Sequence, residues 1–166
     1  MTADDVRLVL KLEPLEMEGG FFRETYRSPL SLSGEGLPPA YRGSRSIGTA
    51  IYYLITPETF SRLHRVPGTE IFHFYLGDPA MMLQLVPDGS SLMVTLGTDL
   101  AKGQEPQAVV RGGVWQGCRL AAGGRFALLG TTMSPGFDYA DYENGDRARL
   151  VAQYPDVAEL IREYTR

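Results

Sequence analysis

The chain is cut into short segments by turn-forming residues that recur at regular intervals. From residue 46 onward, runs rich in apolar, β-branched and aromatic residues alternate with pairs such as Pro-Gly, Asp-Gly and Gly-Gly. Many short strands at such spacing predict an antiparallel sandwich or barrel. No helical segment stands between the runs, which excludes a doubly wound parallel sheet. The predicted strands cover residues 46–55, 59–66, 70–76, 80–86, 91–96, 107–111, 114–120 and 125–133.

Both ends of the chain have a different pattern. Residues 3–12 carry apolar side chains at helical spacing and acids in the first turn, which predicts a short amphipathic helix. Residues 21–27 alternate like a further strand. Residues 147–153 and the segment that begins at Pro155 predict two short helices. The Pro-, Gly- and Ser-rich stretch 28–44 predicts a surface loop, and whether it acts as a lid stays open.

Size and charge limit the class of protein. With 166 residues and 43% hydrophobic content, the sequence predicts one domain over residues 1–166. The net charge of −4, with both signs mixed along the chain, argues against a nucleic-acid partner. No apolar run is long enough to span a bilayer and no signal peptide is recognised, so we expect no membrane partner and a cytoplasmic location. Cys118, the single cysteine, excludes an intrachain disulfide and a multi-cysteine zinc site.

Both histidines of the protein, His64 and His73, lie in the stretch 60–79, with Glu70 between them. Side chains two positions apart in a strand point to the same face of the sheet. His73 should therefore point away from Glu70, while Arg62 and His64 should share a face on the preceding strand. This parity favours His64 over His73 as the partner of Glu70.

The same stretch resembles the first conserved motif of the cupins, in which a His-x-His is followed by a Glu and, six residues later, a Gly. His64, Glu70 and Gly77 occupy these places, and residues 111–116 align with the second motif, Pro-x-Gly-x-x-His. Within the cupins the chain is similar to the cupin_5 group, formerly DUF985. The matching stretches are residues 18–28, 49–54, 64–66, 70–79, 113–116 and 134–138.

The resemblance implies an all-β fold, the double-stranded β-helix or cupin jelly roll, with short N-terminal and C-terminal helices. It also implies a homodimer, and the edge segment 20–27 is a candidate to pair with a partner subunit. In such a barrel, His64 and Glu70 face a lumen that can hold one small molecule.

Departures from the cupin pattern bear on the metal. Val66 replaces the second histidine of the first motif, and Gln116 replaces the histidine of the second motif. Two of the four expected ligands are therefore missing, and one imidazole, one carboxylate and one amide make a poor transition-metal site. We predict no cofactor, and the alternative is a weak divalent-metal site at His64, Glu70 and Gln116.

Two functions fit these residues. Among cupins, sugar and sugar-nucleotide isomerases and epimerases use a lumen His as base and a Tyr as acid, which makes His64 and Glu70 the candidate catalytic residues. Glu70 would hold the tautomer of His64 and raise its basicity. Tyr26, Tyr53 and Tyr139 are candidate acids. The alternative is a non-catalytic protein that binds a small polar ligand through the same residues.

The predicted ligand contacts surround this pair. Arg62 would bind a carboxylate or phosphate if it points inward, and the favoured alternative is an exposed Arg on the strand. Asp138 would orient a lumen group or cap its own turn. A thiol needs a base and an electropositive site to react, so Cys118 is expected to be buried and inert where it lines the pocket. The predicted ligand-binding residues are Arg62, Phe72, Gln116, Cys118, Tyr53, Tyr26 and Asp138.

Overall fold

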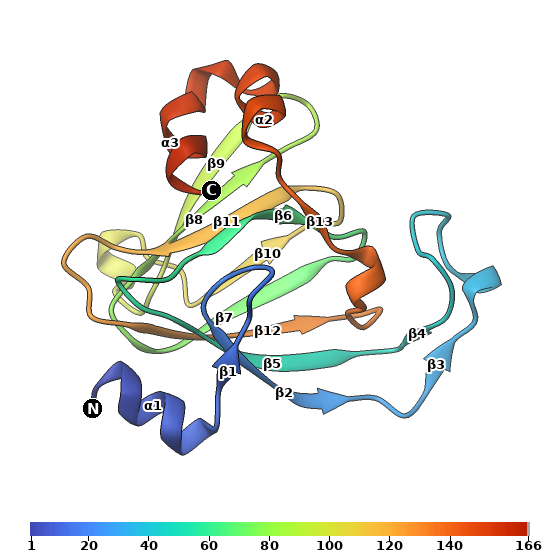
Figure 1. Cartoon of the computed structure of the whole chain (residues 1–166), viewed down its shortest axis with the longest axis horizontal. Helices are drawn as coiled ribbons and strands as arrows, with labels where there is room; N and C mark the ends of the chain where they lie inside the picture. Colours follow the sequence, from blue (N-terminus) through green and yellow to red (C-terminus); the bar gives the residue numbers. More distant parts are fainter. Residues whose placement is uncertain (166) are drawn as a thin grey trace.

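The structure, a computed structural model, describes residues 1–165 and consists mainly of two antiparallel sheets packed face to face (Figure 1). The six-stranded sheet has the order β1-β2-β5-β12-β7-β10. Its strands are β1 (Glu13–Pro14), β2 (Phe21–Arg27), β5 (Thr49–Ile55), β12 (Ala127–Met133), β7 (Glu70–Gly77) and β10 (Gln107–Val110).

The second sheet has five strands in the order β13-β6-β11-β8-β9. They are β13 (Glu143–Asn144), β6 (Ser61–Arg65), β11 (Trp115–Leu120), β8 (Ala80–Leu85) and β9 (Ser91–Leu96). Neighbouring strands in the chain repeatedly belong to opposite sheets, so the strands wind around a shared interior. The predicted antiparallel sandwich is confirmed.

The interior between the sheets is filled by alternate residues of the strands. Tyr53 and Ile55 of β5 point into it, whereas Leu54 between them packs on the outer face of the six-stranded sheet. On β8, Met82 points inward and Leu83 outward. A strand buried on both faces reads as a continuous apolar run, which explains why these segments show little polar alternation.

Three α-helices cover the outer faces. Helix α1 (Ala3–Leu10) buries Val6 against the six-stranded sheet. Helices α2 (Arg147–Gln153) and α3 (Ala158–Glu163) bury Leu150 and Ile161 against the five-stranded sheet. The helices predicted at both ends are therefore confirmed. Short 3₁₀ turns complete the chain: η1 (Gly34–Gly36), η2 (Leu100–Lys102), η3 (Tyr139–Asp141) and η4 (Pro155–Val157).

The segment 28–44 leads into a small hairpin of β3 (Ser31–Leu32) and β4 (Arg45–Ser46), which projects from the body of the molecule (Figure 1). Strands of two residues are too short to show periodicity, so the sequence predicted only a loop here. Among residues 1–165, no helix is long and apolar enough to cross a membrane.

Candidate functional site

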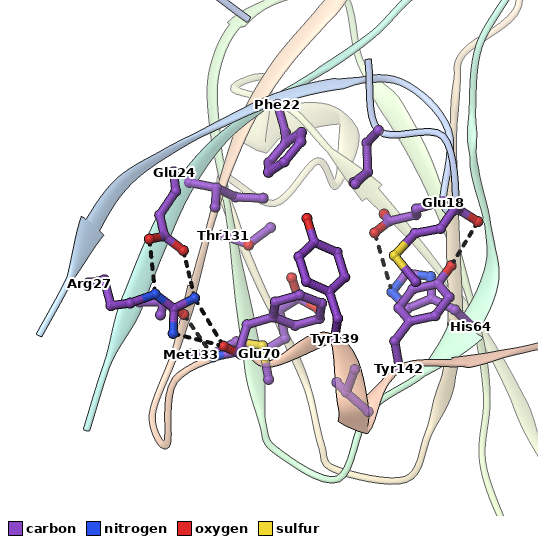
Figure 2. Close-up of a pocket in the computed structure, with 16 residues that line it drawn as sticks. Glu18, Phe22, Glu24, Arg27, His64, Glu70, Thr131, Met133, Tyr139 and Tyr142 are labelled. Carbon is purple, nitrogen blue, oxygen red and sulfur yellow. Dashed lines mark hydrogen bonds and ion pairs between the residues drawn. The ribbon is translucent and has the colours of Figure 1, made fainter. Parts of the chain in front are cut away.

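A cavity of about 70 Å³ lies between the sheets and opens at one end of the sandwich. Its walls come from β2, β5, β6, β7 and β12, and from two loops that fold over the opening. The first loop, residues 15–20, joins β1 to β2, and the second, residues 134–142, follows β12. Figure 2 shows the labelled side chains converging on this space. Residues 28–44 are not among its lining residues, so they form no lid over it in this structure.

His64 lines the cavity from β6 and is only 3% exposed. Its Nδ1 lies 2.8 Å from the carbonyl oxygen of Arg62. A carbonyl can only accept, so Nδ1 carries a proton and donates it. The ring also stacks on Tyr142, with centroids 4.9 Å apart and planes at 17°. The neutral ring therefore has its lone pair on Nε2, and both the tautomer and the ring orientation are fixed.

Glu70 lines the cavity from the first position of β7 and is buried. Its Oε2 accepts a hydrogen bond of 2.6 Å from Nε2 of Gln116, and the Thr131 hydroxyl also bonds to the carboxyl group. Burial raises the pKa of Glu70, because an ionised carboxylate loses its hydration there, and a positive charge on the nearby His64 opposes this effect. Glu70 is thus a buried acid whose hydrogen-bond partners are neutral.

Glu18 supplies a second carboxylate close to His64. Its Oε1 accepts a 2.5 Å hydrogen bond from the Ser61 hydroxyl, and its Oε2 lies 3.9 Å from His64 Nε2. Gly19 follows it with φ of 108°, and a side chain at this position would collide with the carbonyl oxygen of Phe60. Only glycine allows the 15–20 loop to approach β6 so closely, and that approach brings Glu18 to the imidazole.

Aromatic side chains and one ion pair complete the walls. Phe22, Phe137, Tyr139 and Tyr142 line the cavity, and the Tyr139 hydroxyl points toward its centre in Figure 2. Burial raises the pKa of the Tyr142 hydroxyl, and the neighbouring Glu18 adds to this shift. On the opposite side, Arg27 of β2 is paired with Glu24.

The two predicted catalytic residues, His64 and Glu70, both line the cavity, and their roles stay predictions. His73 does not line it, because β7 turns its side chain toward Thr132 and Gln107. The parity argument therefore places both histidines correctly.

The prediction that Arg62 points to the same face of the strand as His64 was wrong. Opposite β11, Gln116 pairs with His64 but Cys118 pairs with Ser61, so β6 contains one extra residue. This β-bulge breaks the two-residue alternation and turns Arg62 away from the cavity. Arg62 borders a separate surface hollow instead.

The other predicted ligand contacts also lie outside the cavity lining. Phe72, Tyr53 and Cys118 belong to the apolar core between the sheets, where burial raises the pKa of the Cys118 thiol. Tyr26 is 54% exposed on β2. The Asp138 carboxylate caps η3 by accepting from the backbone N–H of Ala140. Gln116 reaches the site only through Glu70. The sequence alone did not distinguish the positions of these side chains from positions in the cavity wall.

Sequence reasoning missed Glu18 and Tyr142, whose side chains lie beside the imidazole. Both stand on loops, where strand parity says nothing about direction. The pair Gly19-Gly20 after Glu18 was the available signal, because adjacent glycines with positive φ permit close backbone contact.

The residues present do not fit a cupin metal centre. Val66 offers no donor, and Gln116 directs its amide N–H at Glu70 and does not line the cavity. Within residues 1–165, no group of three or more His, Cys, Asp and Glu side chains is placed to hold a metal ion. The donor set that remains, one imidazole and carboxylates, suits hydrogen bonding and proton exchange.

Comparison with known proteins identifies the family. The family model described as "Cupin superfamily (DUF985)" matches residues 7–144. The chain belongs to the Cupin_5 family. Cupin_5, or DUF985, is the group whose motifs the sequence resembled, and the cupin fold that the resemblance implied is confirmed.

The relatives carry no assigned function in their names. An uncharacterised Saccharomyces cerevisiae protein, YML079W, is 32% identical over an aligned length of 136 residues, and the match covers 75% of this chain and 66% of the yeast protein. A hypothetical protein from Leishmania major superposes with a TM-score of 0.89 at 30% identity, covering 99% of each chain. Protein SO0799 from Shewanella oneidensis gives 0.86 at 32% identity, covering 100% of this chain and 98% of its own.

Oxalate decarboxylase from Bacillus subtilis shares the fold alone. Its TM-score is 0.52 at 14% identity, over 89% of this chain and 35% of the decarboxylase. The activity of this Cupin_5 protein must therefore be argued from its own residues.

Proposed function

We propose that this protein binds a small polar molecule in the cavity and transfers a proton on it, as an isomerase or epimerase does, with His64 as the base. The observation that carries the proposal is the hydrogen bond from His64 Nδ1 to the Arg62 carbonyl, 2.8 Å long. It leaves Nε2 as the basic atom of a ring that lines the cavity.

The proton transfer needs a carbon acid, such as a C–H beside a carbonyl group. His64 Nε2 would take that proton, and the electron pair of the C–H bond would move toward the carbonyl oxygen to give an enolate or enediolate. Glu18, with Oε2 3.9 Å from Nε2, would stabilise the imidazolium that forms. The Tyr139 hydroxyl, which points into the cavity, is positioned to return a proton from another direction (Figure 2).

The size of the cavity restricts the substrate. A volume of about 70 Å³ is well below the roughly 300 to 1,000 Å³ of sites that enclose drug-sized ligands. A sugar nucleotide would not fit inside, so the proposal is limited to small hydroxycarbonyl or aminocarbonyl compounds, or to the reactive end of a longer molecule that extends through the opening.

Deuterium exchange tests the proposal directly. The protein is incubated in D₂O with a panel of small aldoses, ketoses, amino sugars and amino ketones, and NMR follows the replacement of C–H by C–D. We expect exchange with at least one class of compound, and a loss of about 100-fold or more in His64→Asn. His73→Asn is the matched control, since it removes the other histidine, which lies outside the cavity.

The binding-only function remains the second candidate, because the same contacts serve recognition without turnover. Saturation-transfer NMR on the same panel separates the two functions. A compound that binds in a manner dependent on Glu70 and His64, yet never exchanges its C–H, would replace the proposed enzyme by a binding protein.

A further inference from the structure

The charges that line the cavity are mostly negative. Glu18, Glu24 and Glu70 contribute carboxyl groups, whereas Arg27 is the one Lys or Arg among the lining residues within positions 1–165. His64 adds no positive charge while it acts as a neutral base. A ligand that enters therefore meets more negative than positive charge, which favours a cation and disfavours an anion.

Arg27 is already occupied by protein groups. Its Nε and Nη2 donate to the two carboxylate oxygens of Glu24 at 3.0 and 2.7 Å, and its Nη1 and Nη2 both reach the carbonyl oxygen of Phe137 at 3.1 Å. A guanidinium has five N–H donors, and these contacts use most of them. Arg27 thus offers little to a carboxylate or phosphate, and Arg62 lies outside the cavity.

Glu18 and His64 present two acceptors to the same space. Glu18 Oε2 and His64 Nε2 are 3.9 Å apart, which is beyond hydrogen-bond distance. The His64 side chain is almost fully buried, and its Nδ1 is already committed to Arg62. The carboxylate oxygen and the basic nitrogen both accept hydrogen bonds, and neither can donate one to the other. This part of the cavity is therefore suited to a ligand that brings N–H groups.

The remaining walls are aromatic. Phe22, Phe137, Tyr139 and Tyr142 line the same cavity as these acceptors, and Figure 2 shows the Tyr139 hydroxyl pointing into it. Aromatic faces attract cations through their negative quadrupole. Carboxylates combined with aromatic rings provide the contacts that bind an organic ammonium group, with N–H donors directed at oxygen and the carbon substituents against the rings.

We propose that the ligand of this site carries a protonated amine, and that its ammonium group is bound by Glu18 and the aromatic side chains. This inference makes the proposed function more specific. It rests on that function in one respect, because it requires His64 to be neutral. It narrows the substrate class from small polar compounds in general to small amines, such as amino sugars or amino ketones. It also disfavours sugar phosphates and sugar nucleotides as ligands, although a cupin epimerase would suggest them.

Three probes of nearly equal size and different charge test this inference: ethanolamine as the cation, ethylene glycol as the neutral compound and glycolate as the anion. Their dissociation constants are measured by NMR titration of the intact protein at pH 7. We expect ethanolamine to bind at least about ten times more tightly than ethylene glycol, and glycolate to bind most weakly. Equal binding of ethylene glycol, tighter binding of glycolate, or no binding of ethanolamine at 50 mM where another probe binds would each overturn the inference.

Variants locate the ammonium group. Glu18→Gln should weaken ethanolamine binding about ten-fold and leave ethylene glycol nearly unchanged. Glu16→Gln, two residues earlier, exposed and outside the cavity lining, is the matched control and should change neither. Tyr139 is 55% exposed, so Tyr139→Leu should fold normally and weaken ethanolamine binding through the loss of its aromatic face. A cation preference that survives both Glu18→Gln and Tyr139→Leu would overturn the assignment.

The two proposals fail in different ways. If ethanolamine binds selectively but no amine in the panel exchanges its C–H in D₂O, the proton-transfer function is wrong and the amine site stands. If exchange occurs with neutral hydroxycarbonyl compounds and the amine preference is absent, His64 is a base and the amine inference is wrong.

Discussion

Two carboxylates with little exposed surface lie at the same end of the molecule, and their hydrogen-bond partners differ in charge. Asp141 forms a two-point ion pair with Arg45, at 2.7 and 2.5 Å, and both side chains are only 4% exposed. Glu70 is bonded by Gln116 and Thr131, neither of which is charged, and burial raises its pKa. The first acid has a permanent counterion, whereas the charge of the second depends on pH and on what enters the cavity.

The comparison separates a structural group from a functional one. A buried carboxylate with a full set of charged and polar partners holds one conformation and does not exchange a proton. A buried carboxylate with only neutral partners can change its protonation state, and perturbed groups of this kind concentrate at functional sites. The Arg45–Asp141 pair therefore belongs to the frame of the site, whereas the part of Glu70 in its chemistry stays a prediction.

The largest effect is expected from Asp141→Asn. Removal of the charge leaves Arg45 buried without its counterion, which should lower the free energy of unfolding by about 3 kcal/mol in urea denaturation. The double variant Arg45→Met with Asp141→Leu removes both charges and should recover most of this loss. If the double variant is as unstable as the single one, the pair contributes through shape rather than charge.

A smaller loss is expected from Gln116→Met, which removes a hydrogen-bond donor from Glu70. The free energy of unfolding should fall by about 2 kcal/mol at a pH where Glu70 is ionised, because the carboxylate then loses a partner. The loss should shrink at acidic pH, where Glu70 is protonated and costs less to leave unpaired. Thermal unfolding of both proteins at pH 4 and pH 7 measures the difference, and an equal loss at both pH values would show that Glu70 is never ionised.

Glu70→Gln tests the sign of the pH effect. Because the pKa of Glu70 is raised in the folded state above its ordinary value of 4.5, the native protein holds this proton more tightly than the unfolded chain. Its contribution to stability is full below pH 4.5 and is lost as the pH rises through the raised pKa. The variant should differ from wild type by about 1 kcal/mol or less at pH 4, and the difference should move in favour of the variant as the pH rises. Movement in the other direction would contradict the raised pKa.

The smallest change in stability is expected from Glu24→Gln. The Arg27–Glu24 pair is about 40% exposed, so its loss should cost less than about 1 kcal/mol in urea denaturation. The charge preference of the cavity should nevertheless change, because Arg27 becomes free to bind an anion. Glycolate should bind more tightly than in wild type, and unchanged glycolate binding would show that Arg27 does not reach the ligand.

The sequence predicted the strands and the two central residues because both follow from regular geometry. Alternation along β7 places Glu70 and His73 on opposite faces, and the turn residues mark the strand ends. The prediction for the orientation of Arg62 failed because the geometry of β6 is irregular. A single extra residue in this strand interrupts the alternation between its two faces.

Glu18, Tyr139 and Tyr142 needed the tertiary fold. They stand on loops that are distant in sequence, and contacts such as that between the Tyr53 hydroxyl and the Gly19 carbonyl, 2.9 Å long, hold the first of these loops in place. Tyr139 was named as a candidate acid, but only the closing of the 134–142 loop over the sandwich shows why it differs from Tyr26 and Tyr53.

The hairpin of β3 and β4 contributes no residue to the cavity lining, yet it is joined to a loop that forms part of the cavity wall. Arg45 stands on β4, and its partner Asp141 stands on the same loop as Tyr139 and Tyr142. The ion pair thereby links the hairpin to the loop that carries Tyr142, whose ring stacks on His64. Changes in the length or sequence of this peripheral hairpin should therefore retune ligand binding from a distance.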